Sequence, residues 1–515
     1  MNVVIMFFLA ALPILWLVIA LSGLKMPGYW ACPIALLMAG ILAALVWHMD
    51  TIPLLTAGLE GIIMALWPIS LVIIAAIFTY NLCLHTGAME VIKGMLTTVS
   101  NDKRILVLMV AWGFGGFMEG MAGFGTAVAI PASMLCGLGF EPIFSALVCL
   151  IANAAPTAFG SIGIPTITVS NITGLDSMEV AFATTVQLAP IVILTPFLLV
   201  MLTGKSVKAL KGVWHITLAS GLAFILPQML AAKYMGAELP NILGSICAMA
   251  VTIFLSKINK KETPSEYLIN TSKQSKEPKI TWKKAGKAWS PFLLIFAFLV
   301  LTSKLIPVIH YNMAKISTSI VIYQGEGGMP TTFYWIMTPG ILILIAAIIG
   351  AKIQGASGKE IGTVFASSLK QMWKTVLTIA SIMAAAKIMS YSGMISEIAA
   401  LFVGITGSYY PLIAPFIGSI GTFVTGSATS AGVLFGGLQQ QTAQTLGINE
   451  VWLAAANTVG ADAGKIISPQ SIAIAIAAIN QPGVESKIMS KAVKYYLLFV
   501  GLMGAICYIG LQIFF

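Results

Sequence analysis

Charged side chains are scarce in this chain of 515 residues. Asp, Glu, Lys and Arg together make up 9% of it, whereas soluble domains carry about 25%. Apolar residues make up 58%, and the mean hydropathy is +0.95. Apolar runs of roughly 20 residues, enough to cross about 30 Å of hydrocarbon, recur along the whole chain. These features exclude a soluble protein and predict an all-α polytopic membrane protein with about 12 to 14 transmembrane helices.

Catalytic and metal-binding patterns are also missing. The chain has only four histidines and six cysteines, and it contains no HExxH, GxSxG or Walker pattern. The cysteines all fall inside apolar runs without CxxC spacing, which is typical of small buried side chains rather than disulfides or metal ligands. We therefore expect no enzyme activity, no cofactor and no bound metal.

Basic residues outnumber acidic ones and give a net charge of +10, but they lie mostly in short loops. This is the positive-inside pattern, which sets the orientation of membrane helices and does not indicate nucleic-acid binding. It predicts a multi-pass protein of the cytoplasmic membrane, with the lipid bilayer as its partner and both termini outside. The oligomeric state is left open. The loops expected in the cytoplasm are 85–104, 205–211, 257–287, 352–374 and 487–494.

One polar segment divides the chain. Residues 257–287 contain nine lysines, and we interpret them as a mobile cytoplasmic linker. The predicted membrane halves are therefore 1–256 and 288–515. Each half contains one glycine-rich stretch, 115–165 in the first and 426–470 in the second.

The two glycine-rich stretches follow a similar order. Each begins with small residues, passes a Leu-Gly pair and reaches an asparagine flanked by alanine. In both stretches twelve residues separate this asparagine from a proline, Asn153 from Pro165 and Asn457 from Pro469. This order suggests an internal repeat.

Glycine and serine clusters allow a membrane helix to break, which leaves unpaired backbone groups at the half-helix ends. Such backbone is tolerated at membrane depth only inside protein or beside a cavity, and paired broken helices indicate a transporter binding site. Close helix packing is the alternative explanation for the small residues. We expect the half-helix ends and nearby polar groups to bind a small carboxylate through Gly123, Gly125, Thr126, Asn153, Ser161, Ser427, Thr429, Ser430, Asn457, Lys465, Ser468 and Gln470.

Several charged residues lie within apolar runs, where ionisable groups are costly and are candidates for function. Glu119 is the leading candidate for a proton carrier, although a structural hydrogen bond would also explain it. Asp462 lies three residues before Lys465, so these two share a helix face and either pair internally or act in proton coupling and substrate contact. Lys387 either meets a carboxylate, which would make it a further candidate, or extends to the membrane interface.

The strings FMEGMAGFGTAVAI, GLGFEPIFSALVCLIANAAPTAFGSIGIP and TGSATSAGVLFGGLQ, followed by LAAANTVGADAGKIISPQSIAIA, resemble the lactate permease family of bacterial and archaeal carriers. The resemblance covers essentially the whole chain. It implies uptake of lactate, and often glycolate, by proton symport. It also implies a fold akin to the ion-transporter superfamily, with two broken-helix or re-entrant hairpin repeats.

The chain departs from the family pattern in three segments. Ala127 replaces a proline, and Asp462 stands in a segment that is usually glycine-rich. In the segment that is commonly TGSDTSSN, Ala428 replaces the aspartate, and Ala431 and Gly432 also differ. The lost acid at 428 leaves the coupling ion open, so a sodium-coupled carrier of another small organic anion is the alternative. A passive channel is a third interpretation. The transported carboxylate and its enantiomer are not fixed by the sequence.

Overall fold

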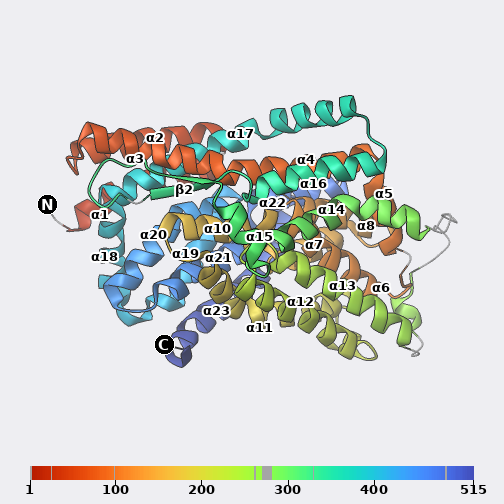
Figure 1. Ribbon diagram of the computed structural model, residues 1–515. Helices are drawn as coiled ribbons and strands as arrows, with labels where there is room; N and C mark the ends of the chain where they lie inside the picture. Colours follow the sequence, from red (N-terminus) through yellow and green to blue (C-terminus); the bar gives the residue numbers. More distant parts are fainter. Residues whose placement is uncertain are drawn as a thin grey trace.

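The structure is a computed structural model of the chain, and it is almost entirely helical (Figure 1). It describes residues 3–24, 26–97, 99–123, 125–259, 263–269, 281–328, 330–481 and 484–514. The helices are, in chain order, α1 (Val3–Val18), α2 (Gly28–Leu45), α3 (Thr51–Met64), α4 (Leu71–His85), α5 (Ala88–Thr97), α6 (Lys103–Val107), α7 (Gly115–Met121), α8 (Thr126–Gly137), α9 (Pro142–Ala152), α10 (Gly160–Thr173), α11 (Ser177–Thr203), α12 (Trp214–Tyr234), α13 (Pro240–Ile258), α14 (Trp282–Thr302), α15 (Pro307–Ala314), α16 (Pro339–Gln354), α17 (Gly358–Tyr391), α18 (Met394–Thr406), α19 (Tyr410–Thr425), α20 (Ala428–Leu446), α21 (Glu450–Ile467), α22 (Pro469–Ile479) and α23 (Glu485–Phe514).

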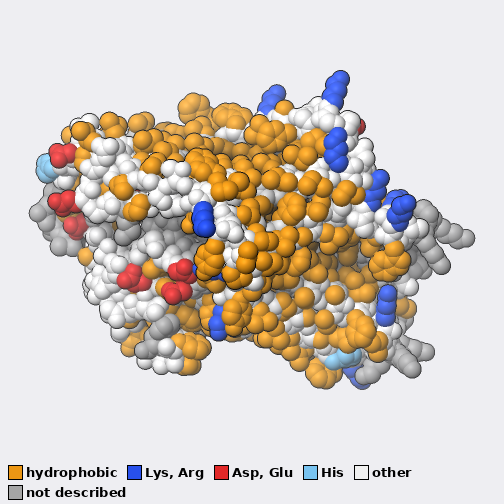
Figure 2. Space-filling view, in the orientation of Figure 1, with side chains coloured by type: hydrophobic (Ala, Val, Ile, Leu, Met, Phe, Trp, Pro, Cys, Tyr) orange, Lys and Arg blue, Asp and Glu red, His pale blue; other side chains and the backbone are white. Residues whose placement is uncertain are grey.

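Wider π-helical turns join several of these helices into longer rods. The turn η1 (Ile19–Gly23) extends α1, η2 (Ala65–Ser70) joins α3 to α4, and η3 (Leu108–Phe114) joins α6 to α7. Within the described residues, ten helices are long and apolar enough to span a membrane, or eleven if one bent pair is included. This is fewer than the 12 to 14 full spans predicted, because the separate halves of broken helices are too short to cross alone. Hydrophobic side chains form the broad band in Figure 2.

Both glycine-rich stretches fold as pairs of broken helices, as predicted. In the first, residues 122–125 separate α7 from α8, and the pair α9 and α10 is bent by 66°. In the second, Gly426 and Ser427 separate α19 from α20, and Ser468 separates α21 from α22. The shared order of helix, break, hairpin and second break agrees with the proposed repeat.

The equal asparagine-to-proline spacing does not reflect equivalent positions. Asn153 is the C-cap of α9, directly at the first bend, whereas Asn457 lies inside the continuous helix α21. Pro165 lies within α10, but Pro469 is the first residue of α22. The same spacing in sequence therefore places the asparagine and the proline at different positions relative to the helix breaks in the two stretches.

The two stretches pack against each other. Helix α10 contacts α20, α22 contacts α8 and α9, and α21 contacts α11, so segments far apart in sequence form one bundle (Figure 1). A second group of helices lies along the upper edge of Figure 1, where α17 packs on α2 and α3, and α16 packs on α4 and α14. The predicted halves 1–256 and 288–515 thus contribute to both groups, and their boundaries remain a prediction.

Two connecting segments have more structure than expected. The loop between α15 and α16 contains an antiparallel pair of strands, β1 (Ser317–Val321) and β2 (Pro330–Tyr334). Helix α14 begins at Trp282, inside the predicted linker 257–287. Of that linker, residues 260–262 and 270–280 lie outside the described residues.

One described segment of the linker, residues 263–269, packs on the loop before α6. The Ile269 backbone donates to the Asn101 carbonyl at 3.0 Å. Arg104, the single arginine of the chain, lies 4.1 Å from the centre of the Tyr267 ring. Its guanidinium group pairs with Asp102 at 2.7 Å and donates to the Ala209 carbonyl at 2.8 Å. We call Asp102, Arg104 and Tyr267 the arginine clamp.

Basic and acidic side chains gather at opposite ends of the visible face. Blue side chains are concentrated at the right of Figure 2 and red ones at the left, and both termini lie toward the left in Figure 1. The separation arises from the same charged residues on which the predicted orientation is based, and the orientation itself remains a prediction.

Candidate functional site

One cavity lies where the two glycine-rich stretches meet α2 and α17. Its volume is about 420 Å³. Such a volume is within the range of small-molecule sites. The first stretch supplies Glu119, Gly125, Thr157, Gly160, Ser161 and Pro165, and the second supplies residues 426–430, Lys465 and 469–470. Residues 423–425 before the second stretch, and Ser471 and Ile474 after it, also line the cavity. The remaining wall consists of Leu21, Met26, Gly28, Tyr29, Cys32, Lys374, Thr375, Thr378, Ile379 and Ile382.

Glu119 is the acidic group of the cavity wall. It lies in the last turn of α7, and its side chain is 2% exposed. The Asn153 side chain lies beside its carboxyl group, but Oε2 accepts no hydrogen bond from any described residue. A Cβ atom on Gly160 would lie 2.6 Å from Oε1, so only glycine leaves room for this carboxyl group. The site therefore holds an acidic group with unused hydrogen-bonding capacity.

Lys465 is the basic group contributed by the second stretch. It lies in the last turn of α21, where the helix dipole favours a cation. Its Nζ donates to the Gly426 carbonyl at 3.4 Å, and the residue is 8% exposed. Its charge acts on Glu119, although the two side chains form no direct ion pair within 4.0 Å. Opposite charges from the two stretches thus face one cavity.

Asp462 lies behind the cavity wall, one helical turn before Lys465. It is fully buried, and its charge interacts with those of Glu119 and Lys465. The Ala158 backbone lies near its carboxyl group, but neither oxygen forms a hydrogen bond of normal geometry within the described part of the chain. Two buried carboxyl groups and one ammonium group therefore form a single electrostatic cluster.

The backbone at the start of α10 is strained. Ser161, Ile162 and Gly163 have φ values of 44°, 59° and 78°. Left-handed backbone is unfavourable for a β-branched residue such as Ile162 and is often found at functional sites. The Ser161 hydroxyl donates to the Ala122 carbonyl at 2.9 Å. This bond ties the second break of the first stretch to its first break.

The break between α19 and α20 also depends on close contact of the Gly426 backbone with the Gln470 side chain. Gly426 has a φ of 73°, and a Cβ atom there would lie 1.8 Å from Oε1 of Gln470. The Ser427 hydroxyl accepts a hydrogen bond from the Ser430 backbone at 3.3 Å and caps α20. The two breaks of the second stretch therefore meet at the cavity.

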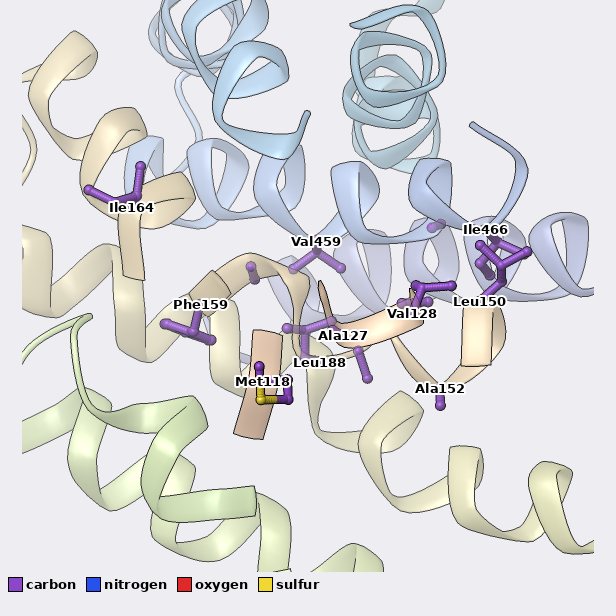
Figure 3. Close-up of a cluster of buried hydrophobic side chains, with 14 of the residues drawn as sticks. Met118, Ala127, Val128, Leu150, Ala152, Phe159, Ile164, Leu188, Val459 and Ile466 are labelled. Atoms are coloured by element: carbon purple, nitrogen blue, oxygen red, sulfur yellow. The ribbon is translucent and has the colours of Figure 1, made fainter. Parts of the chain in front are cut away.

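Apolar side chains fill the space around the broken helices. Figure 3 shows Met118, Phe159 and Val459 close to the break between α7 and α8, together with Ala127 from the start of α8. These residues belong to the main hydrophobic core, which includes side chains from both stretches. The core fixes the positions of the broken ends around the cavity.

The structure brings most of the sequence-predicted residues to the cavity or its support. Those in the wall are Glu119, Gly125, Ser161, Ser427, Thr429, Ser430, Lys465 and Gln470. Four further predicted residues lie outside the wall and either contact residues near it or interact with them electrostatically. They are Gly123, Thr126, Asn153 and Asp462. Gly123 packs on Ser161, and Thr126 donates to the Gly123 carbonyl at 2.7 Å.

Three predicted residues lie elsewhere. Asn457 is buried in α21 and donates to the Ala431 carbonyl at 3.3 Å, and the Ser468 hydroxyl is buried at the second break. Lys387 meets a carboxylate, as one of the two interpretations expected, but that group is Glu60 at 2.9 Å and not a group of the cavity.

Sequence reasoning missed the wall formed by α2 and α17. Tyr29 comes from the start of α2, and Lys374, Thr375 and Thr378 come from α17. The Lys374 ammonium group lies 4.7 Å from the centre of the Tyr29 ring. The only sequence signal was the presence of hydroxyl residues at positions 375 and 378 beside an apolar run.

Comparison with known proteins identifies the family of the chain. The family model of L-lactate permeases matches residues 6–514. The chain belongs to the L-lactate permease family. As a permease it is a membrane transporter and not an enzyme, and the resemblance drawn from its motifs is confirmed.

Curated relatives within this permease family match over most of their length. An L-lactate permease of Streptococcus iniae is 49% identical, covering 87% of this chain and 93% of the relative. An L-lactate permease of Bacillus subtilis is 34% identical, and the match covers 100% of this chain and 97% of the relative. The glycolate permease GlcA of Escherichia coli is 34% identical, and the match covers 98% of this chain and 95% of the relative.

Two solved transporter structures are similar to this permease at 14% identity. They are MtrF of Neisseria gonorrhoeae, from a class of antimetabolite efflux pumps, and the YdaH transporter of Alcanivorax borkumensis. Each has a TM-score of 0.48. The match to MtrF covers 89% of this chain and 84% of MtrF. The match to YdaH covers 86% of this chain and 85% of YdaH.

Proposed function

We propose that this protein imports lactate, and glycolate or related 2-hydroxy monocarboxylates, across the cytoplasmic membrane by proton symport. The observation that carries the proposal is the shared cavity, which presents Glu119 and Lys465 beside the broken ends of α8 and α20. The names of the relatives support the substrate class, because both lactate and glycolate permeases match nearly the whole chain.

The binding step follows from the charges and donors of the wall. Lys465 and the N-terminal ends of α8 and α20 attract the carboxylate, since helix N-termini favour anions. The hydroxyl groups of Ser161 and Thr429 and the amide of Gln470 can hydrogen-bond the substrate hydroxyl. A cavity of about 420 Å³ accommodates a three-carbon acid together with water.

The proton compensates for the substrate charge. Moving one negative charge into a cell interior at −100 mV costs about 2.3 kcal/mol. Proton binding at Glu119, with Asp462 in the same cluster, makes the loaded carrier less negative. Electroneutral symport removes the opposing electrical work and allows the proton gradient to drive uptake.

We further propose that the protein lies in the cell membrane with both termini outside and that this structure faces the cytoplasm. In that orientation the start of α2 lies at the inner side, and its residues Gly28 and Tyr29 line the cavity together with Lys374. Alternating access would move the broken-helix bundle relative to the group that contains α2 and α17.

The test is uptake of labelled L-lactate by proteoliposomes with an imposed pH gradient. We expect acidification outside to accelerate uptake, and uptake to be unchanged when choline replaces sodium. Collapse of uptake without sodium would contradict proton symport. In the same vesicles, unlabelled glycolate should compete with labelled lactate. If neither unlabelled lactate nor unlabelled glycolate exchanges with labelled lactate, the substrate assignment is wrong.

A further inference from the structure

A buried ion pair joins α3 to α17 away from the transport cavity. Lys387 Nζ lies 2.9 Å from Glu60 Oε1, and the two side chains are only 11% and 3% exposed. Neither residue lines the cavity. Buried charges are costly at membrane depth, so an intramembrane ion pair is a candidate for a functional role.

Two tyrosines extend this pair to the loop between α15 and α16. The Tyr391 hydroxyl donates to both oxygens of Glu60, at 3.0 and 3.2 Å. The Tyr391 ring stacks on Tyr323, with the centroids 3.7 Å apart and the planes 5° from parallel. We call Glu60, Lys387, Tyr391 and Tyr323 the tyrosine latch. It connects one loop, α3 and α17 in a single network.

The loop is also bound to α3 directly. The Gln324 backbone donates to the Thr56 hydroxyl at 3.1 Å, one turn before Glu60. At the neighbouring Gly61, a Cβ atom would lie 2.5 Å from the Ala384 Cα, so the backbones of α3 and α17 are in close contact here. The latch therefore closes the space between these helices at a tightly packed point.

Helix α17 connects the latch to the cavity. Lys374, Thr375 and Thr378 line the cavity, whereas Lys387 and Tyr391 lie near the C-terminal end of the same helix. At 1.5 Å per residue, Thr378 and Tyr391 are about 20 Å apart along the helix axis. Any tilt of α17 that reshapes the cavity must therefore change the contacts at its latch end.

We propose that the tyrosine latch is the extracellular gate of the carrier and that it is closed in this structure. When the carrier opens outward, α17 moves away from α3 and the loop, the two tyrosine rings separate and the hydrogen bonds to Glu60 break. Tyr323, Tyr391, Glu60 and Lys387 thus position α17 and set the balance between inward-open and outward-open states. They do not contact the substrate.

The test measures access to the cavity from outside. A cysteine replaces Thr378 in a variant whose six natural cysteines are alanine, and a membrane-impermeant maleimide is added to right-side-out vesicles without substrate. We expect Tyr323→Ala to increase the labelling rate roughly fivefold, since an aromatic pair contributes only about 1 kcal/mol to the closed state. Tyr391→Phe, which keeps the ring but removes the hydroxyl group, should also increase the rate.

The control is Tyr311→Ala, which changes an exposed tyrosine on α15, the helix that precedes the loop. Its labelling rate should equal that of the parent. Unchanged labelling from outside in both Tyr323→Ala and Tyr391→Phe, with normal labelling from the cytoplasmic side, would overturn the gate. The gate rests on the orientation proposed above, in which the loop between α15 and α16 lies outside. Because the assay contains no substrate or ion gradient, its outcome does not depend on proton coupling.

Discussion

The Glu119 carboxyl group and the Lys465 ammonium group face one cavity from the two different glycine-rich stretches. Their charges interact without a direct ion pair, and one oxygen of Glu119 has no hydrogen bond from a described residue. A tight pair would hold both groups in one state. Two separated groups can instead bind different cargoes, a proton at Glu119 and an anion at Lys465, while their charges remain coupled.

Replacing Glu119 with glutamine removes the titratable group at nearly constant volume. We expect Glu119→Gln to abolish the acceleration of uptake by a pH gradient, while exchange of labelled for unlabelled lactate at equal pH persists. Transport assays in proteoliposomes measure both. Glu179→Gln, which changes an exposed carboxylate on α11, should respond to the gradient as the parent does. An unchanged gradient response in Glu119→Gln would exclude Glu119 as the proton carrier.

Lys465 should contribute mainly to anion affinity. We expect Lys465→Met to raise the KM for lactate at least tenfold, because a charge-assisted hydrogen bond contributes about 1.5 to 3 kcal/mol. Lys374→Met, at the exposed part of the same wall, should raise KM only a few fold because solvent screens that charge. Initial uptake rates over a range of concentrations give both values. Equal effects of the two substitutions would contradict a specific role for Lys465.

Gly426 tests whether the break between α19 and α20 is required. An alanine there would adopt an unfavourable positive φ and collide with Gln470. We expect Gly426→Ala to destabilise the protein by about 1 to 3 kcal/mol and to reduce uptake strongly. Gly437→Ala is the matched control, because its Cβ would meet only Ile172 at 3.8 Å. Thermal unfolding and uptake are measured in parallel, and wild-type behaviour of Gly426→Ala would show that the contact is dispensable.

The arginine clamp should stabilise the end of the molecule where residues 263–269 pack on the loop before α6. Arg104→Lys keeps the charge but loses the planar donors that reach Asp102 and the Ala209 carbonyl. We expect a loss of roughly 2 to 4 kcal/mol, because a buried carboxylate is left incompletely paired. Lys103→Ala, which removes an exposed neighbour, should have little effect. The melting temperature in detergent distinguishes the two, and similar values would argue against the clamp.

Local features of the chain were predictable from the sequence. The breaks near positions 123 and 426 coincide with glycine and serine clusters, because these residues determine where the backbone can leave the helical conformation. The cavity residues Glu119 and Lys465 were found for a similar reason, since an ionisable group within an apolar run is conspicuous wherever the chain folds.

Long-range relationships were not predictable in the same way. The partner of Lys387 is Glu60 on another helix, and only the packing of α3 on α17 brings them together. Tyr29 and Thr378 carry no local sign that they meet at the cavity. For Asn457, the spacing to proline matched that of Asn153, but the structure places Asn457 inside α21 and not at a break.

The Gly426 carbonyl that holds Lys465 is a backbone group, and it cannot lose or gain a proton. The hydrogen bond that positions Lys465 therefore does not depend on a titratable partner when Glu119 takes up the proton, as proposed above. The wall becomes less negative at that moment, and its attraction for an anion increases. Because such coupling is reciprocal, we expect a bound carboxylate also to increase the affinity of the site for the proton, so that each cargo favours the binding of the other.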